Sequence, residues 1–147
     1  MPNNGAVNAI FEGMNLHIGN NAGHKKHILV VDDEPLVSES IQMLLENDDY
    51  VVHQVESGYL ALAMFAEGRY DMIFTDYCMP EMRGDKFAAA IKRMCPTQPI
   101  VMITAFPEKL QTSANALGGV DSFICKPFDA NVLRTALTRY ARSDAQA

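Results

Sequence analysis

The side chains best suited to chemistry follow short apolar segments of the chain. Residues 27–32 (HILVVD) end in Asp32 and continue to Asp33, and residues 70–75 (YDMIFT) are followed by Asp76. A charged carboxylate at the edge of an apolar core is costly unless a cation pairs with it. If these three aspartates lie close together they repel one another, so the partner we expect is a cation.

A hydroxyl group and an ammonium group occur in equivalent places. Residues 99–104 (PIVMIT) end in Thr104, and residues 120–125 (VDSFIC) are followed by Lys126. In a parallel sheet the carboxyl ends of the strands lie along one edge, where all five side chains would converge. The carboxylates then favour a hard divalent cation such as Mg²⁺. The lysine and the threonine suit the oxygens of a phosphoryl group.

Strand-like and helix-like apolar patterns alternate along the chain. The four segments above and a fifth at 50–55 (YVVHQV) are rich in Val and Ile, which is typical of strands. Helical spacing of apolar residues is weaker at 57–67 and 107–118. It is strong in three stripes: Val37, Ile41, Leu44 and Leu45; Phe87, Ala88, Ile91 and Met94; and Val132, Leu133, Ala136, Leu137 and Tyr140.

Five alternations of strand and helix predict an α/β fold, a doubly wound parallel sheet of five strands with helices on both faces. The first, third and fourth strand segments are the most uniformly apolar, so we expect them at the centre of the sheet. One sheet of this kind accounts for the whole chain from residue 27 onward.

Four motifs in this order resemble the response-regulator receiver domain of bacterial two-component signalling. They are LVVDDEP (29–35), FTDYCMPEMRG (74–84), MITA (102–105) and FICKPF (123–128). The resemblance covers residues 27–142. It implies a flavodoxin-like fold with strand order 2-1-3-4-5 and five flanking helices, an order taken from the family.

The resemblance gives each reactive residue a role. Asp76 would accept the phosphoryl group as an acyl phosphate, and Lys126 would bind the phosphoryl oxygens. Thr104 would donate its hydroxyl once phosphorylation draws it inward, and Phe123 occupies the aromatic switch position. The alternative for Phe123 is a core side chain. The Lys126-Pro127 bond resembles a cis peptide of the family.

The resemblance also implies the ligands of Mg²⁺. Asp33 and Asp76 would supply carboxylate oxygens, the backbone carbonyl of Cys78 would complete the protein ligands, and Asp32 would hold a metal-bound water. The alternative for the three aspartates is that they cap the helices that follow them.

The function implied is that of a stand-alone receiver. It would take a phosphoryl group from the phosphohistidine of a sensor histidine kinase or a histidine phosphotransferase and later hydrolyse the acyl phosphate. A switched face formed by the helix at 107–118, the strand at 120–125 and the helix with the stripe from Val132 to Tyr140 would bind a downstream target protein. One alternative is a receiver-like binding module that is never phosphorylated. Another is an aspartate-nucleophile phosphatase, which usually needs a second aspartate where Cys78 stands.

Three residues depart from the family pattern. Cys78 replaces a residue that is frequently polar or acidic, and Phe106 is bulky and apolar; both flank the path of the hydrolytic water. A thiol beside a metal site also raises the hypothesis of redox control at Cys78, against the alternative of an unreactive small residue. Arg83 stands where the family often has an acidic residue before the glycine.

Composition limits the other classes of function. The chain has 147 residues, 48% of them hydrophobic, which suits one domain with a sizeable core. A net charge of −6 argues against a nucleic-acid partner. The sequence contains no apolar run near the roughly 18 residues that span a membrane. Three separated cysteines fit free thiols in the cytoplasm, where we expect the protein to be.

The predicted boundaries are a flexible leader at 1–26, the receiver domain at 27–142 and a tail at 143–147. In the leader, Val7, Ile10, Phe11 and Met14 would share one face of a short helix able to bind a partner or a second copy. The alternative is a disordered tail. The four histidines show no spacing for metal binding or catalysis, so we expect surface or strand positions for them.

Overall fold

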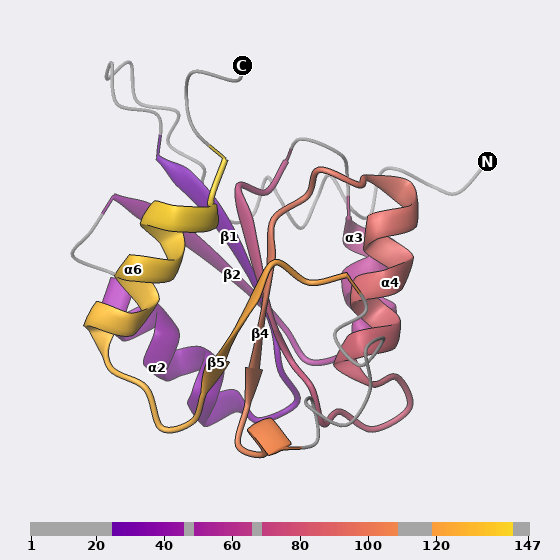
Figure 1. Cartoon of the computed structure of the whole chain (residues 1–147), viewed down its shortest axis with the longest axis horizontal. Coiled ribbons are helices and arrows are strands. Elements are labelled where there is room, and N and C mark those ends of the chain that lie inside the picture. Colours follow the sequence, from indigo (N-terminus) through magenta and orange to yellow (C-terminus); the bar gives the residue numbers. More distant parts are fainter. Residues whose placement is uncertain (1–24, 46–48, 66–68, 109–118, 143–147) are drawn as a thin grey trace.

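The computed structural model describes four ranges of the chain, which are 25–45, 49–65, 69–108 and 119–142. Within them strands and helices alternate as the apolar pattern predicts (Figure 1). Five strands are described: β1 (Lys26–Val31), β2 (Tyr50–Val55), β3 (Met72–Asp76), β4 (Ile100–Thr104) and β5 (Ser122–Cys125). The helices of these ranges are α2 (Pro35–Leu45), α3 (Gly58–Met64), α4 (Gly84–Met94) and α6 (Ala130–Tyr140).

The strands form one parallel sheet in the order β2-β1-β3-β4-β5, as predicted. The three most apolar strands, β1, β3 and β4, are therefore the central ones. Every residue of β3 and of β4 is buried. The order reverses between β1 and β3, and doubly wound sheets bind ligands at the carboxyl ends of the strands at such a point.

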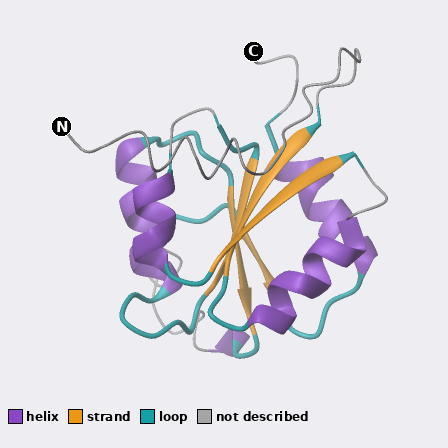
Figure 2. Cartoon of the chain, turned by 180° about the vertical axis from the view of Figure 1, so that it is seen from behind, coloured by secondary structure: helices purple, strands orange, loops and turns teal. Residues whose placement is uncertain are grey.

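Helices cover both faces of the sheet. In Figures 1 and 2, α2 and α6 lie on one side of the strands, and α3 and α4 lie on the other. The side chains of β1 alternate accordingly. Ile28 and Val30 pack in the core beneath α2 and α6, whereas Leu29 and Val31 pack in the core beneath α3 and α4. A strand that is buried on both faces must be apolar throughout, which is why β1 lacks a polar side.

Two strands, β3 and β5, begin two residues later than the apolar pattern predicts, and an aspartate directly precedes each of them. Asp71 comes just before β3, and its Oδ2 atom accepts a hydrogen bond of 2.8 Å from the backbone N–H of His27. Asp121 comes just before β5, and its Oδ2 atom accepts one of 2.8 Å from the N–H of Ile100. These carboxylates hold the starts of neighbouring strands together at the edge opposite the predicted site.

The predicted helices are found wherever the structure describes the chain. Ser57 caps α3 by accepting a hydrogen bond from the N–H of Leu60, and Asp129 caps α6 in the same way through Val132. Of the helix predicted at 107–118, only residues 107 and 108 are described, and both are helical. The rest of that helix, the leader pattern at 7–14 and the tail at 143–147 lie outside the described residues.

His53 lies in β2 and is only 2% exposed. Its Nδ1 atom is 3.3 Å from the hydroxyl oxygen of Tyr70, which is fully buried, and its ring centroid is 5.9 Å from that of His27. Burial lowers the pKa of His53 to about 4, and the charges of His27 and Arg69 act in the same direction. The imidazole is therefore neutral in the folded protein near pH 7.

We predict that His53 makes the fold sensitive to acid. The unfolded chain takes up a proton near the ordinary histidine pKa of about 6.5, whereas folded His53 does so only near 4, so lowering the pH favours the unfolded state. Between pH 7.5 and pH 5 the wild type should lose about 2 kcal/mol more of its free energy of unfolding than His53→Gln. Urea unfolding of both proteins at the two pH values tests this, and equal losses would contradict it.

Candidate functional site

The five predicted site residues lie at the carboxyl edge of the sheet. Asp32 and Asp33 follow β1, Asp76 ends β3, Thr104 ends β4 and Lys126 follows β5. Three of these side chains are nearly inaccessible to solvent, since Asp32, Asp76 and Thr104 are 2%, 4% and 1% exposed. Residues separated by more than 90 positions in the sequence are thus brought together by the parallel strands.

The three carboxylates form one cluster. One oxygen from each of Asp32, Asp33 and Asp76 lies within 4.8 Å of the others. The Oδ1 atom of Asp32 accepts a hydrogen bond of 2.8 Å from the backbone N–H of Glu34. By contrast, the Oδ1 atom of Asp33 is buried and has no hydrogen-bond partner among the described residues. A buried carboxylate oxygen without a donor is a good ligand for a cation.

Lys126 contributes a positive charge to the cluster. Its Nζ atom is 3.4 Å from Oδ2 of Asp32 and 3.4 Å from Oδ1 of Asp76, and its side chain is 17% exposed. Burial alone would lower the pKa of Lys126, but the charges of Asp76 and Asp32 outweigh it and raise that pKa. The Lys126-Pro127 peptide is cis, as predicted.

One lysine does not neutralise three carboxylates. Burial, and after it the neighbouring charge of Asp32, raises the pKa of Asp76 to about 6, while Lys126 opposes both effects. Burial also raises the pKa of Asp32. With all groups ionised, the three carboxylates and Lys126 leave two negative charges in excess. A divalent cation with a preference for oxygen ligands fits both this charge and the donor atoms.

Thr104 lies at the same edge, next to the end of β5. Its register partner is Cys125, and its backbone carbonyl accepts a hydrogen bond of 2.7 Å from the N–H of Lys126. Its side-chain oxygen accepts a hydrogen bond of 2.9 Å from the N–H of Phe106. The proton of the hydroxyl group is not used by this contact, so Thr104 can still donate to a second acceptor.

The loop from Asp76 to α4 depends on a glycine that the sequence patterns alone do not single out. A Cβ atom on Gly84 would stand 2.0 Å from the backbone oxygen of Asp76. The N–H of Gly84 donates a hydrogen bond of 2.9 Å to the carbonyl of Tyr77. The last residue of the FTDYCMPEMRG motif therefore brings the start of α4 directly against the backbone of Asp76.

An ion pair at the start of α4 was not predicted from the sequence. Arg83 donates from Nε to Oδ1 of Asp85 at 3.1 Å and from one terminal nitrogen to Oδ2 at 2.9 Å. The only signal in the sequence was that Arg83 departs from the family pattern. Cys78, between Asp76 and this pair, is an exposed free thiol, as is Cys125, while Cys95 is a buried one.

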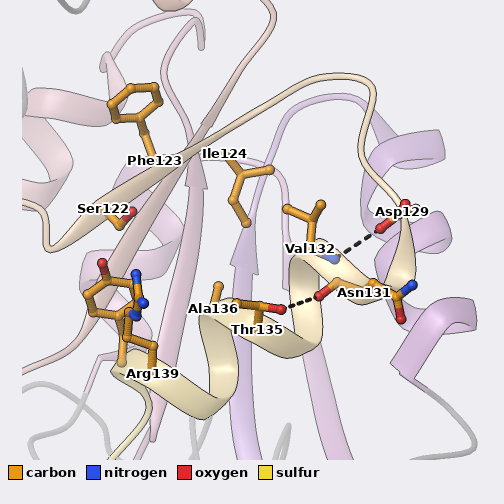
Figure 3. Close-up of a pocket in the computed structure, with 10 residues that line it drawn as sticks. Ser122, Phe123, Ile124, Asp129, Asn131, Val132, Thr135, Ala136 and Arg139 are labelled. Carbon is orange, nitrogen blue, oxygen red and sulfur yellow. Dashed lines mark hydrogen bonds between the residues drawn. The ribbon is translucent and has the colours of Figure 1, made fainter.

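Phe123 lies apart from the carboxylates, on β5. It is 37% exposed, so the alternative of a core side chain is wrong. A pocket of about 350 Å³ lies between β5 and α6, with Phe123 and Val132 in its lining and with Asp129 and Arg139 among its charged residues. Figure 3 shows Phe123 and Ile124 projecting from opposite sides of β5. None of the three clustered aspartates lines this pocket.

The chain belongs to the response-regulator receiver family. The family model described as "Response regulator receiver domain" matches residues 28–138. The family works in two-component signalling, and its members switch between states on phosphorylation. Both the motifs identified in the sequence and the observed strand order agree with this assignment.

Two curated relatives are transcriptional regulatory proteins. The chain is 38% identical over 117 residues to ResD of Bacillus subtilis, which covers 78% of this chain and 48% of ResD. It is 34% identical over 119 residues to SrrA of Staphylococcus aureus, with 79% and 49% covered. The chain therefore spans about half the length of these relatives. The expected lack of a nucleic-acid partner stays a prediction.

Two solved structures show the likeness in three dimensions. The chemotaxis response regulator CheY4 of Vibrio cholerae matches with a TM-score of 0.70 and 30% identity, covering 80% of this chain and 99% of CheY4. The response regulator TrrA of Thermotoga maritima, in complex with Mg²⁺ and BeF, matches with a TM-score of 0.71 and 29% identity, covering 78% and 98%. Among the described residues, no helix is long and apolar enough to cross a membrane.

We predict that Gly84→Ala disturbs the site more than a matched change at Gly58. Both glycines are the first residue of a helix, but a Cβ on Gly84 meets backbone at 2.0 Å, whereas one on Gly58 meets the flexible Met82 side chain at 2.8 Å. Gly84→Ala should lower the free energy of unfolding by about 2 kcal/mol. Gly58→Ala should cost less than half of that. Urea unfolding compares the two variants, and equal losses would refute the prediction.

Proposed function

We propose that this receiver is a phosphorylation switch and that Asp76 is its phosphoacceptor. The observation that supports it most is the position of Asp76, a buried carboxylate that clusters with Asp32 and Asp33 and has the Lys126 ammonium 3.4 Å from its Oδ1 atom. The matched domain extends over most of 27–142, which we take as the receiver domain. Residues 1–26 and 143–147 are then a leader and a tail, and we expect the protein in the cytoplasm.

The phosphodonor is a phosphohistidine of a sensor histidine kinase or of a histidine phosphotransferase. A carboxylate oxygen of Asp76 attacks the phosphorus atom in line with the bond to the donor. A P–O bond forms, the P–N bond breaks, and the electron pair returns to the imidazole nitrogen of the donor. Lys126 then pairs with an oxygen of the transferred group, because its ammonium already lies beside Asp76.

Mg²⁺ is the cation that we assign to the acidic cluster. Asp33 and Asp76 supply carboxylate oxygens, the backbone carbonyl of Cys78 supplies a third, and Asp32 lies next to them. Two features support this assignment. The buried Oδ1 atom of Asp33 has no hydrogen-bond partner among the described residues, and the cluster carries two negative charges in excess. The bound cation would supply neutralisation of the charge on the transferring phosphoryl oxygens.

The switch operates through Thr104 and Phe123. Thr104 donates a hydrogen bond from its hydroxyl group to an oxygen of the phosphoryl group and moves toward it; in the present structure its hydroxyl oxygen accepts a hydrogen bond from the N–H of Phe106. Because β4 pairs with β5, this movement alters the packing next to Phe123. The exposed surface of β5 and α6, including the pocket of Figure 3, then changes its affinity for a downstream target protein.

A phosphoryl-trapping experiment tests the proposed function. The protein is incubated with Mg²⁺ and acetyl phosphate, and acid-stable, base-labile phosphate is measured together with the intact mass. Wild type should gain one phosphoryl group and Asp76→Asn should gain none. Asp129→Asn is the matched control, since asparagine caps α6 as well as aspartate does, and it should be labelled like the wild type.

The outcomes separate the alternative functions. A receiver-like module that is never phosphorylated would show no label in any of the proteins. An aspartate-nucleophile phosphatase would release phosphate over many turnovers without accumulating labelled protein. Labelling of Asp76→Asn to the wild-type level would place the phosphoacceptor elsewhere and would contradict the proposal.

We further predict that Thr104→Val separates phosphorylation from switching. Valine has nearly the same shape as threonine but has no hydroxyl group, so Asp76 should still be modified while the movement toward β5 is lost. Amide resonances of 122–125 should shift on addition of Mg²⁺ and beryllofluoride in the wild type and hardly shift in Thr104→Val. Equal shifts in both proteins would exclude Thr104 from the switch.

A further inference from the structure

Arg83 is the N-cap residue of α4, at the end of the phosphoacceptor loop, and makes a two-pronged ion pair with Asp85, two residues further on. Both carboxylate oxygens of Asp85 accept hydrogen bonds from its guanidinium, at 3.1 and 2.9 Å. Asp85 lies in the first turn of α4, and its side chain is only 10% exposed. The paired contact fixes the orientation of the guanidinium plane as well as its position.

The same guanidinium lies over the ring of Tyr77, the residue that follows Asp76. The distance from the Cζ atom of Arg83 to the ring centroid is 5.7 Å, which is within cation–π range. Tyr77 is 8% exposed, and its ring packs with Met102 and Val120. Its backbone N–H donates to the carbonyl of Ile103 at 3.1 Å. Tyr77 is thus held by β4 and by Arg83 together.

These contacts are made by residues on both sides of Cys78 in the chain. The carbonyl of Cys78 is the third protein ligand assigned to Mg²⁺. Before it, Tyr77 is held by the contacts described above. After it, the loop closes through the hydrogen bond from the N–H of Gly84 to the carbonyl of Tyr77. Asp85 and Tyr77 also raise the pKa of Arg83, so the guanidinium stays charged throughout the range in which the site works.

We propose that Arg83 is a positioning residue, which through Asp85 and Tyr77 holds the backbone at Cys78 in the place where it binds the cation beside Asp76. This inference rests on the proposed function, since it concerns the cation of the same site. Arg83 itself touches neither the cation nor the phosphoryl group. Its contribution is to the geometry of a backbone ligand, the carbonyl of Cys78.

Removal of Arg83 should change the affinity for Mg²⁺ in opposite directions, depending on whether Arg83 acts by positioning the loop or only by its positive charge. Arg83 is positive, so its removal should by charge alone strengthen the binding of Mg²⁺ to an acidic site. If Arg83 positions the loop, its removal should weaken that binding instead. Residues that orient a metal ligand commonly contribute about tenfold or more to the affinity.

The test is Mg²⁺ binding by isothermal titration calorimetry at constant pH. Arg83→Ala should weaken binding roughly tenfold. Arg83→Lys should weaken it nearly as much, because lysine keeps the charge but lacks the planar fork. Lys86→Ala is the matched control, since it removes one positive charge from an exposed position of the same helix. It should leave the affinity unchanged or slightly higher.

Two further measurements show whether the variants are folded and whether the titrated cation binds at the proposed site. Thermal unfolding verifies that the variants are folded, as expected for an Arg83 side chain that is 55% exposed. Asp76→Asn shows whether the titrated cation occupies the proposed site. If wild type binds Mg²⁺ and Asp76→Asn does not, but Arg83→Ala binds like Lys86→Ala, only the positioning role is overturned. If wild type fails to bind Mg²⁺, the metal assignment fails and the inference fails with it.

Discussion

Crowding of three carboxylates against a single ammonium group is the constraint on which this structure depends. Asp32 and Asp76 are almost wholly removed from water, and Asp33 adds a third negative charge within 4.8 Å. Such a cluster is destabilising for the fold, because each charge loses solvation and repels the others. It persists because the ends of β1 and β3 are set by a sheet that is buried on both faces. The core beneath the helices therefore stabilises an arrangement that the site alone would not hold.

The central strands explain how residues from distant parts of the sequence come to lie in one site. Each site residue lies at the end of a strand or directly after it, so its position follows from the register of the sheet. Ile73 pairs with Ile100, and Thr104 pairs with Cys125, without a bulge between them. A movement of Thr104 would therefore act on β5 through the hydrogen bonds of the ladder that the two strands share.

The residue patterns predict an α/β fold with a parallel five-stranded sheet and place five reactive side chains at its carboxyl edge. The strand order, the role of Phe123 and the ligand role of Cys78 came only from the family resemblance. Apolar runs identify β1, β3 and β4 as central, and polar residues at their ends identify the reactive edge. Contacts between side chains are a different matter. Nothing in the sequence places Tyr70 beside His53, or shows that Asp71 binds the backbone of β1 instead of belonging to β3. The pairing of Arg83 with Asp85 at the start of α4, and the position of Arg83 over the ring of Tyr77, are likewise seen only in the structure.

The geometry of Lys126 connects the resting site with the reaction proposed for it. Its ammonium is 3.4 Å from an oxygen of Asp32 and 3.4 Å from an oxygen of Asp76, whereas an optimal charged hydrogen bond is about 2.7–2.9 Å. The lysine is therefore shared between two partners and strongly bound by neither. A cation bound at the carboxylates would neutralise them, and the ammonium would then lose little by turning to a third anion. A phosphoryl group on Asp76 would present such an anion directly beside it, so the incomplete pairing in this structure is what leaves the lysine available for the reaction.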